Sequence, residues 1–326
     1  MTAAVQTLPL PDPENLRPFN FHRDLGEVAD LIELCFAGRL DGDGRRYVAQ
    51  MRRAAQNPKL LSWTLSPRKV GNLTMGGFVW QEGNKVVGNL SCLPIYAAGK
   101  RAYLIANVAV HPDHQRRGIA RKLTEAALDD FRIKGVEWSW LQVDDDNLPA
   151  ASLYDNAGFS EVTRRTTWHS TPSTIEAQPP SDPDIKITRR KGSDWALQEK
   201  WLDQIYPPSI TWHLPLRKSQ LKSGLQGYVN RLMEDKRIRQ WSLRRDGELL
   251  AVGTLQNSPS QADKVWLACD REHETTAISH LVPFLRKKHN RTRTLSLDYP
   301  TGQAQEALHA AGFIKHQTLI WMRRRI

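Results

Sequence analysis

Hydrophobic positions in the first half of the chain alternate between helical spacing and the short apolar runs typical of strands. Helical spacing follows Asp24, which we expect to be the N-cap, and the turn Glu82-Gly83-Asn84 separates two strand-like runs as in a hairpin. The predicted elements in chain order are a strand at 16–21, helices from 24 and at 41–55, strands at 75–81, 86–95 and 101–110, a helix around 123–131, a strand at 136–143, a helix at 149–156, and final strands at 159–170. This mixture predicts an α/β fold with a mixed sheet.

The second half of the chain repeats this pattern faintly after a proline-rich stretch. Residues 171–183 contain four prolines among small polar residues and are predicted to be a linker. Beyond them, a helical pattern from Asp194 parallels the one at Asp24, and Ala310–Phe313 parallels Asn156–Phe159. We therefore predict a tandem duplication. Its parts are a flexible arm at 1–15, a first domain at 16–170, the linker at 171–183 and a second domain at 184–326.

Charge is distributed unevenly between the two predicted domains. The 326 residues carry a formal net charge of +11, of which +2 lies in residues 1–170 and +9 in residues 171–326. A basic excess of this size can attract nucleic acid. The basic residues scatter, however, and cluster only briefly at 286–288 and 323–325, without a nucleic-acid motif. A solvated basic face is the favoured interpretation, and a nucleic-acid-associated protein is an alternative.

Neither membrane nor export signals are evident in the sequence. No apolar run approaches the roughly 20 residues that a membrane helix needs, and residues 1–6 lack the pattern of a signal peptide. Cys35, Cys92 and Cys269 are isolated in apolar surroundings, which favours buried thiols over a disulfide framework or a metal site. We expect a cytoplasmic protein without a bound metal.

The most informative stretch follows the apolar run 104–110. Pro112 and Asp113 end that predicted strand, and a helix begins soon after the sequence Gln115-Arg116-Arg117-Gly118-Ile119-Ala120. The unpaired N–H groups and the dipole of a helix N-terminus attract anions, and glycine lets a phosphate approach the backbone. Arg116, Arg117 and Arg121 add positive charge. The stretch therefore predicts a phosphate site, whereas the six residues alone also fit a surface helix with a basic N-terminus.

Two motifs together carry a family resemblance. The Gln-x-x-Gly-x-Ala spacing of 115–120 after a Val-x-Val strand resembles the acetyl-CoA signature of the GCN5-related N-acetyltransferase (GNAT) superfamily. The segment from Asn147 through Tyr154 to Gly158 and Phe159 is similar to the second signature of that superfamily, at about the usual distance. The resemblance covers residues 16–170 and, together with the predicted duplication, implies two tandem acetyl-CoA N-acyltransferase (GNAT) folds.

The resemblance also implies roles for individual residues. Val108 and Val110 would line the pantetheine arm, and the N–H of Val108 or Ala109 would polarise the thioester carbonyl. Tyr154 would protonate the leaving thiolate, and Asn147 would contact CoA or cap its helix. As plain structure, the valines are also core residues and Tyr154 a core tyrosine. The residues expected to bind acetyl-CoA are Val108, Ala109, Val110, Gln115, Arg116, Arg117, Gly118, Ile119, Ala120, Arg121 and Asn147.

The general base is not evident. Many relatives carry a glutamate where this chain has Ala106, and the candidate carboxylates here are Asp144, Asp145 and Asp146 at the end of the predicted strand 136–143. An acidic turn of this kind is also typical of a solvated loop. Deprotonation through water, or an acceptor amine of low pKa, would make a base unnecessary. The expected reaction is acetyl transfer from acetyl-CoA to a primary amine of a small molecule or peptide. An acetyl-CoA sensor without turnover is the alternative.

The second domain lacks the same chemistry. Its equivalent stretch from Asp270 contains no glycine, and Glu272 and Glu274 place negative charge where a phosphate would bind. Leu308 stands at the position equivalent to Tyr154. We therefore expect the second copy to be degenerate and not to bind CoA.

Overall fold

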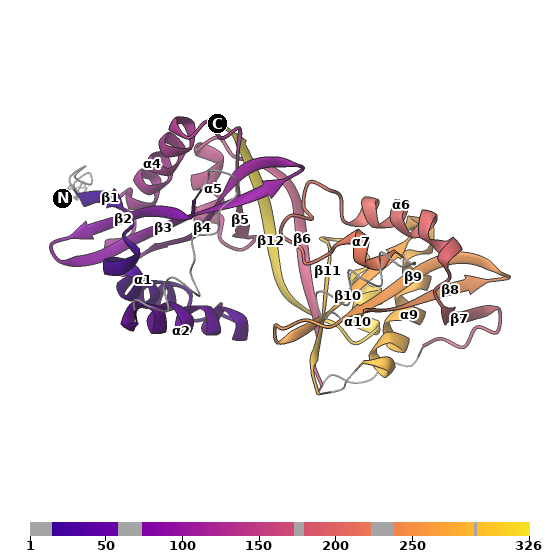
Figure 1. Ribbon diagram of the computed structural model, residues 1–326. Coiled ribbons are helices and arrows are strands. Elements are labelled where there is room, and N and C mark those ends of the chain that lie inside the picture. The colour runs from indigo at the N-terminus through magenta and orange to yellow at the C-terminus, as the bar shows by residue number, and fades with distance from the viewer. Residues whose placement is uncertain (1–14, 58–73, 173–178, 223–237, 290–291) are drawn as a thin grey trace, which may run out of the picture. The chain divides into compact units, whose positions relative to one another are not determined.

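The computed structural model describes residues 15–57, 74–172, 179–222, 238–289 and 292–326 (Figure 1). The predicted arm at 1–15 lies almost wholly outside the described residues, as does part of the predicted linker. The chain forms two compact units. Unit 1 comprises Met1–Val162 and Trp321–Ile326, and unit 2 comprises Thr163–Ile320.

Unit 1 is a mixed sheet with helices on both faces (Figure 1). Its strands are hydrogen-bonded in the order β1, β2, β3, β4, β5, followed by the end of β12 and the start of β6. Neighbours from β1 to β4 are antiparallel, and β4 and β5 are parallel. The elements are β1 (Leu16–Pro18), α1 (Phe21–Phe36), α2 (Gly42–Gln56), β2 (Gly76–Glu82), β3 (Lys85–Ala97), β4 (Lys100–Val110), the 3-10 turn η2 (Pro112–His114), α4 (Ile119–Ile133), β5 (Trp138–Asp144), α5 (Leu148–Asn156), β6 (Ser160–Ser170) and β12 (Ile314–Arg325).

Two apolar layers hold this sheet. On one face, the buried stripes of α1 and α2 pack on β2, β3 and β4 through Val79, Val86 and Ala109. Helix α4 presents Leu123, Ala127, Leu128 and Phe131 as its buried stripe. Phe131 stacks on Tyr103 of β4 with ring centroids 4.4 Å apart. The helical spacing seen in the sequence is therefore the spacing of core residues.

The N-cap of α1 was predicted wrongly. The helix begins at Phe21, and Asn20 caps it by accepting hydrogen bonds from the N–H groups of His22 and Arg23. Asp24 lies in the first turn, where its carboxylate accepts a hydrogen bond from Asn20 N at 2.7 Å and pairs with Arg17 at 2.7 Å. An asparagine that was assigned to the strand therefore takes the capping role, and the aspartate supports it from inside the helix.

The prediction of more than one strand at 159–170 was also wrong, because those residues form the single strand β6. The second half of the chain supplies the missing neighbour. Residues Trp321–Ile326 at the end of β12 belong to unit 1, where Ile326 N donates to Glu137 O at 2.9 Å and Trp321 and Met322 are buried. In return, residues 163–170 of β6 belong to unit 2. Each unit is thus completed by a strand end from the other half of the sequence.

Unit 2 repeats the element order of unit 1. Strands β9 and β10 are antiparallel and β10 and β11 are parallel, as are β3, β4 and β5 in unit 1. This confirms the predicted duplication of a mixed α/β fold. The elements are β7 (Ile185–Arg189), the 3-10 turn η3 (Gly192–Asp194), α6 (Trp195–Ile205), α7 (Lys218–Leu221), β8 (Ile238–Arg245), β9 (Glu248–Gln256), β10 (Ala262–Cys269), the 3-10 turn η4 (Arg271–His273), α9 (Glu274–Lys288), β11 (Thr294–Pro300) and α10 (Gln305–Ala310).

Candidate functional site

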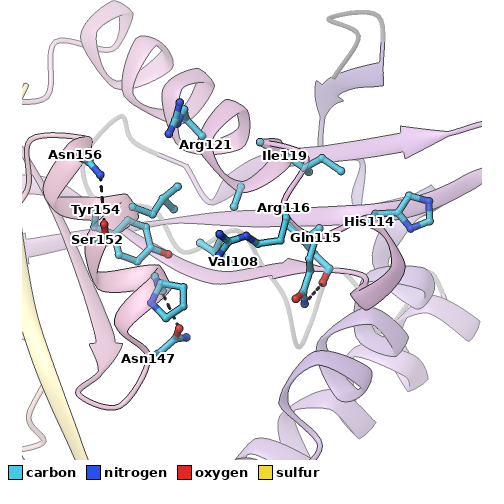
Figure 2. Close-up of a pocket in the computed structure, with 16 residues that line it drawn as sticks. Val108, His114, Gln115, Arg116, Ile119, Arg121, Asn147, Ser152, Tyr154 and Asn156 are labelled. Carbon is cyan, nitrogen blue, oxygen red and sulfur yellow. Dashed lines mark hydrogen bonds between the residues drawn. The ribbon is translucent and has the colours of Figure 1, made fainter. Parts of the chain in front are cut away.

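A cleft opens in unit 1 where two parallel strands part. The pairing of β4 with β5 runs from Ala102 and Trp138 to Ile105 and Leu141 and then stops. Beyond that point a cleft of about 550 Å³ lies between β4, the start of α4 and helix α5 (Figure 2). Its lining includes Val108 and Val110, so the main chain of β4 borders a space that a ligand can enter.

Strand β4 carries a bulge at this place. Ser91 pairs with Ala106 and Asn89 pairs with Ala109, so that Asn107 and Val108 face only one residue of β3. Asn107 has a left-handed backbone, with φ of 51°. The buried side chain of Asn89 holds it there, since Asn89 Nδ2 donates to Asn107 O at 2.8 Å. The bulge re-aims the backbone of Val108 at the edge of the cleft.

The predicted phosphate site is an open helix N-terminus. Gly118 is the residue before α4 and has a left-handed backbone with φ of 79°, and no side chain among the described residues caps the helix. The first bond of the α4 backbone runs from Lys122 N to Gly118 O, so the N–H groups of Ile119, Ala120 and Arg121 precede the helical ladder. The side chain of Gln115 instead bonds to the end of β4, with Nε2 donating to Val110 O at 3.1 Å. Backbone donors thus converge at one end of the cleft.

Positive charge reaches the cleft from some of the predicted arginines but not from all of them. Arg116 and Arg121 line it, and Figure 2 shows Arg116 extending across the cleft toward Tyr154. Arg117 is not among the lining residues, because it pairs with Glu82 at 3.1 Å, and His114 lies 3.3 Å from the same carboxylate. This ion pair fixes the turn between β4 and α4 against the sheet.

The remaining predicted site residues divide in the same way. Tyr154 of α5 lines the cleft with only 6% of its surface exposed, and burial raises the pKa of its phenol. Asn147 lines the cleft and also caps α5, accepting from Ala150 N at 3.3 Å. Ala109 does not line it, because its side chain packs into the core beneath α1 and α2. The structure therefore gathers Val108, Val110, Gln115, Arg116, Gly118, Ile119, Ala120, Arg121, Asn147 and Tyr154 around one cleft.

The opposite side of β4 holds polar residues that sequence reasoning missed. Asn107 Nδ2 lies 3.4 Å from both Ser91 Oγ of β3 and Tyr47 Oη of α2. Asn89 and Ser91 are two residues apart in an otherwise apolar run, so their alternation was the available signal. Cys35 of α1 donates to Val110 O at 3.3 Å, and burial raises the pKa of this thiol. These groups surround the face of the bulge that turns away from α4.

The acidic turn after β5 is tied to the loop between α1 and α2. Arg39 Nη1 donates to Asp144 at 2.9 Å and to Asp146 at 2.9 Å, and the Asp144 carboxylate raises the pKa of the Arg39 guanidinium. Asp144 is therefore present near the site but neutralised by its partner.

The equivalent place in unit 2 is a smaller cleft of about 320 Å³. Glu274 begins α9, and its carboxylate accepts a hydrogen bond from Tyr299 Oη at 2.8 Å. Asp270 precedes the helix and accepts from Glu272 N at 3.3 Å. Carboxylates thus occupy the helix N-terminus where unit 1 offers free backbone donors.

Two further findings concern the described residues only. They contain no group of three or more histidine, cysteine, aspartate and glutamate side chains arranged to hold a metal ion. No helix among them is both long and apolar enough to cross a membrane.

Part of the first unit is similar in sequence to known proteins. The model of the acetyltransferase (GNAT) family matches residues 48–159. The [ribosomal protein bS18]-alanine N-acetyltransferase of Salmonella typhimurium is 43% identical over 65 residues, which are 20% of this chain and 44% of that protein. The chain therefore aligns with less than half the length of this curated relative.

Two solved structures share the fold along nearly the whole chain. A GCN5-related N-acetyltransferase from Sphaerobacter thermophilus superposes with a TM-score of 0.60 at 12% identity, covering 97% of each chain. A tandem GNAT protein from the clavulanic acid biosynthesis pathway superposes with a TM-score of 0.53 at 16% identity, covering 95% of this chain and 98% of that one. These matches show a tandem GNAT fold.

Proposed function

We propose that this chain, whose residues 48–159 belong to the acetyltransferase (GNAT) family, transfers an acetyl group from acetyl-CoA to the nitrogen of a primary amine. One observation carries the proposal. The cleft beside the bulge of β4 has an uncapped helix N-terminus at one end and the buried phenol of Tyr154 at the other. An anion site and a proton donor at opposite ends of one cleft are what a CoA thioester requires.

The start of α4 supplies the donor anchor. Backbone N–H groups of residues 119–121 and the helix dipole favour the pyrophosphate of CoA, and Gly118 keeps the approach free of a side chain. Arg116 and Arg121 line the same cleft and add charge-assisted hydrogen bonds. Arg117 acts indirectly, because its ion pair with Glu82 holds the turn that presents the backbone N–H groups and the two arginines.

The bulged strand orients the thioester. Because β4 and β5 part after Ile105 and Leu141, the main chain near Val108 and Val110 is available to pair with the amides of the pantetheine arm. The left-handed Asn107 turns the backbone N–H of Val108 toward the cleft, where it would stabilise negative charge on the carbonyl oxygen.

The chemistry then needs one bond made, one broken and two protons moved. The amine nitrogen attacks the thioester carbon, the C–N bond forms, and the C–S bond breaks as the tetrahedral intermediate collapses. Tyr154 gives its phenolic proton to the departing thiolate and recovers one from solvent. The proton lost by the amine passes to water. The raised pKa of Tyr154 keeps the phenol protonated at neutral pH, ready for this role.

Release of free CoA thiol, coupled to mass-spectrometric detection of an acetylated amine, tests this function. The test is run across a panel of amines with the full chain and with Tyr154→Phe. Amine-dependent thiol release that falls in the variant is the expected result. Tight CoA binding without transfer to any amine would instead favour a sensor that binds the ligand without turnover.

The cellular setting remains part of this proposal. Cys35, Cys92 and Cys269 are free thiols, two of them buried, which suits a reducing compartment such as the cytoplasm. The acceptor we propose is a small-molecule or peptide amine rather than nucleic acid.

A further inference from the structure

Three side chains form a row across the sheet on the side of β4 away from α4. Ser91 of β3 pairs with Ala106 of β4, and Gln142 of β5 directly follows Leu141, the partner of Ile105. Paired residues in neighbouring strands point to the same face of a sheet. Ser91 and Gln142 therefore flank Ala106, which contributes only a methyl group between the two polar side chains.

This row lies on the face covered by α1 and α2. The hydrogen bonds of Asn107 to Ser91 and to Tyr47 of α2 identify the face. Ala106 and Asn107 are partly exposed although β4 is an interior strand, and Ser91, Tyr47 and Gln142 are partly exposed as well. Partial exposure in the middle of a sheet indicates a surface that a ligand can reach.

One buried hydrogen-bond donor in the row has no partner. Gln142 Nε2 is covered by surrounding atoms and makes no hydrogen bond within the described part of the chain. Buried donors in native proteins are nearly always paired. Because the Gln142 side chain as a whole is partly exposed, a small rotation would present this donor to a carbonyl oxygen bound over Ala106.

The charged and titratable groups around this row favour an amine that arrives neutral. Arg39, from the α1–α2 loop, neutralises Asp144 and also pairs with Asp146. Cys35 of α1 and Tyr47 of α2 are two further titratable groups on this face, each hydrogen-bonded to β4.

Amines differ greatly in how often they are neutral. With pKa values of about 7.7–8.0 for an α-amine and about 10.4 for lysine, about a third of an α-amine but only about a thousandth of a lysine side chain is neutral at pH 7.5. An α-aminoacyl group also carries a carbonyl one carbon from its nitrogen, whereas the carbon chain next to a lysine amine offers no hydrogen-bond acceptor.

We propose that Ser91, Ala106, Asn107 and Gln142 form the subsite for an α-aminoacyl acceptor, namely an amino-acid amide or the N-terminus of a peptide. The acceptor carbonyl takes the hydrogen bond of Gln142 Nε2, and the neutral amine donates to Ser91 Oγ while its lone pair faces the thioester. This inference rests on the proposed acetyl transfer, because it concerns which amine that reaction accepts.

The test compares two probes, trialanine amide and Nα-acetyl-lysine methylamide, as acceptors for the full chain between pH 7 and 9.5. Rates are expressed per concentration of neutral amine, which removes the difference in basicity. Trialanine amide is expected to show a kcat/KM at least about tenfold higher than that of the lysine probe. A tenfold difference corresponds to the free energy of one hydrogen bond to a buried donor.

Gln142→Met keeps the length of the side chain and removes its donor. We expect the KM for trialanine amide to rise about ten- to hundredfold, with the lysine probe and the Kd of CoA unchanged. Gln81→Met is the matched control, because this β2 glutamine already donates to Gly83 O at 2.6 Å, and it should alter neither probe.

Equal rates per neutral amine for the two probes would overturn the inference. So would a Gln142→Met effect that is the same for both probes, or no effect at all. A protein that binds CoA but acetylates neither probe would contradict the proposed function instead. The two failures are therefore distinguishable.

Discussion

Replacing Tyr154 with phenylalanine removes one oxygen from the cleft and little else. The ring is buried and meets Phe159 edge-on with centroids 6.1 Å apart, a contact that phenylalanine keeps. The Kd of CoA should change less than about threefold, and the free energy of unfolding by less than about 1 kcal/mol. The variant therefore isolates the proton that the phenol gives to the leaving thiolate.

The expected loss is large because general acid catalysis contributes about 10²–10⁴ in rate. At 1.36 kcal/mol per tenfold, this equals about 3–5.5 kcal/mol of transition-state stabilisation. The pH dependence has a definite sign. Since burial raises the pKa of Tyr154, the phenol stays protonated to higher pH than an ordinary tyrosine. Its ionisation should therefore not lower kcat at any pH up to about 10.

Steady-state release of CoA thiol between pH 6.5 and 10 measures both effects. Tyr103→Phe is the matched control. It removes a buried phenol of the same unit that donates to Thr74 O at 3.0 Å, and Tyr103 is not a cleft residue. It should keep kcat within about threefold. If Tyr154→Phe retained full kcat, or if Tyr103→Phe lost as much, the phenol of Tyr154 would not be the proton donor.

Two other substitutions test how the cleft is built. Gly118→Ala makes the left-handed backbone at this position unfavourable by about 1–2 kcal/mol, so the free turn relaxes away from it. Because CoA binding needs the left-handed turn, calorimetry should find binding weakened about 5- to 30-fold. Arg324→Ala removes the guanidinium that donates to Ala157 O at the end of α5, and displacing this helix should lower kcat about ten- to hundredfold with Arg324→Lys partly restoring it.

Each of these substitutions has a matched control on the same element. Gly135 follows α4 with φ of 61°, so Gly135→Ala strains the backbone comparably but should leave the Kd of CoA unchanged. Arg325 is exposed next to Arg324, and Arg325→Ala should leave kcat unchanged. If a variant and its control had equal effects, the loss of CoA binding or of kcat would come from lower stability or altered net charge and not from a change in the cleft.

The sequence predicted the parts of the site that depend on local structure. The strand ending at Val110, the turn and Gly118 lie within ten residues of one another, so period and turn chemistry suffice to place them. Asn147 caps the short helix that carries Tyr154, and their spacing was equally readable. The duplication was visible for the same reason, since each copy repeats the local pattern.

Features set by distant partners could not be read in this way. Arg117 is held away from the cleft by Glu82, which lies 35 residues away along the chain. The polar row needs three strands in register, and the bulge at Asn107 depends on Asn89 of another strand. The exchange of strand ends is the extreme case, because no pattern in Trp321–Ile326 specifies which unit it completes.

The central claim is that one open helix N-terminus, that of α4 in unit 1, binds CoA while α9 in unit 2 does not. Isothermal titration of the full chain with CoA tests it most directly, with Gly118→Ala and Glu274→Gln as variants. We expect one CoA per chain, weakened by Gly118→Ala and unaffected by Glu274→Gln. No binding heat, two CoA molecules per chain, or a site that responds to Glu274→Gln alone would contradict the account.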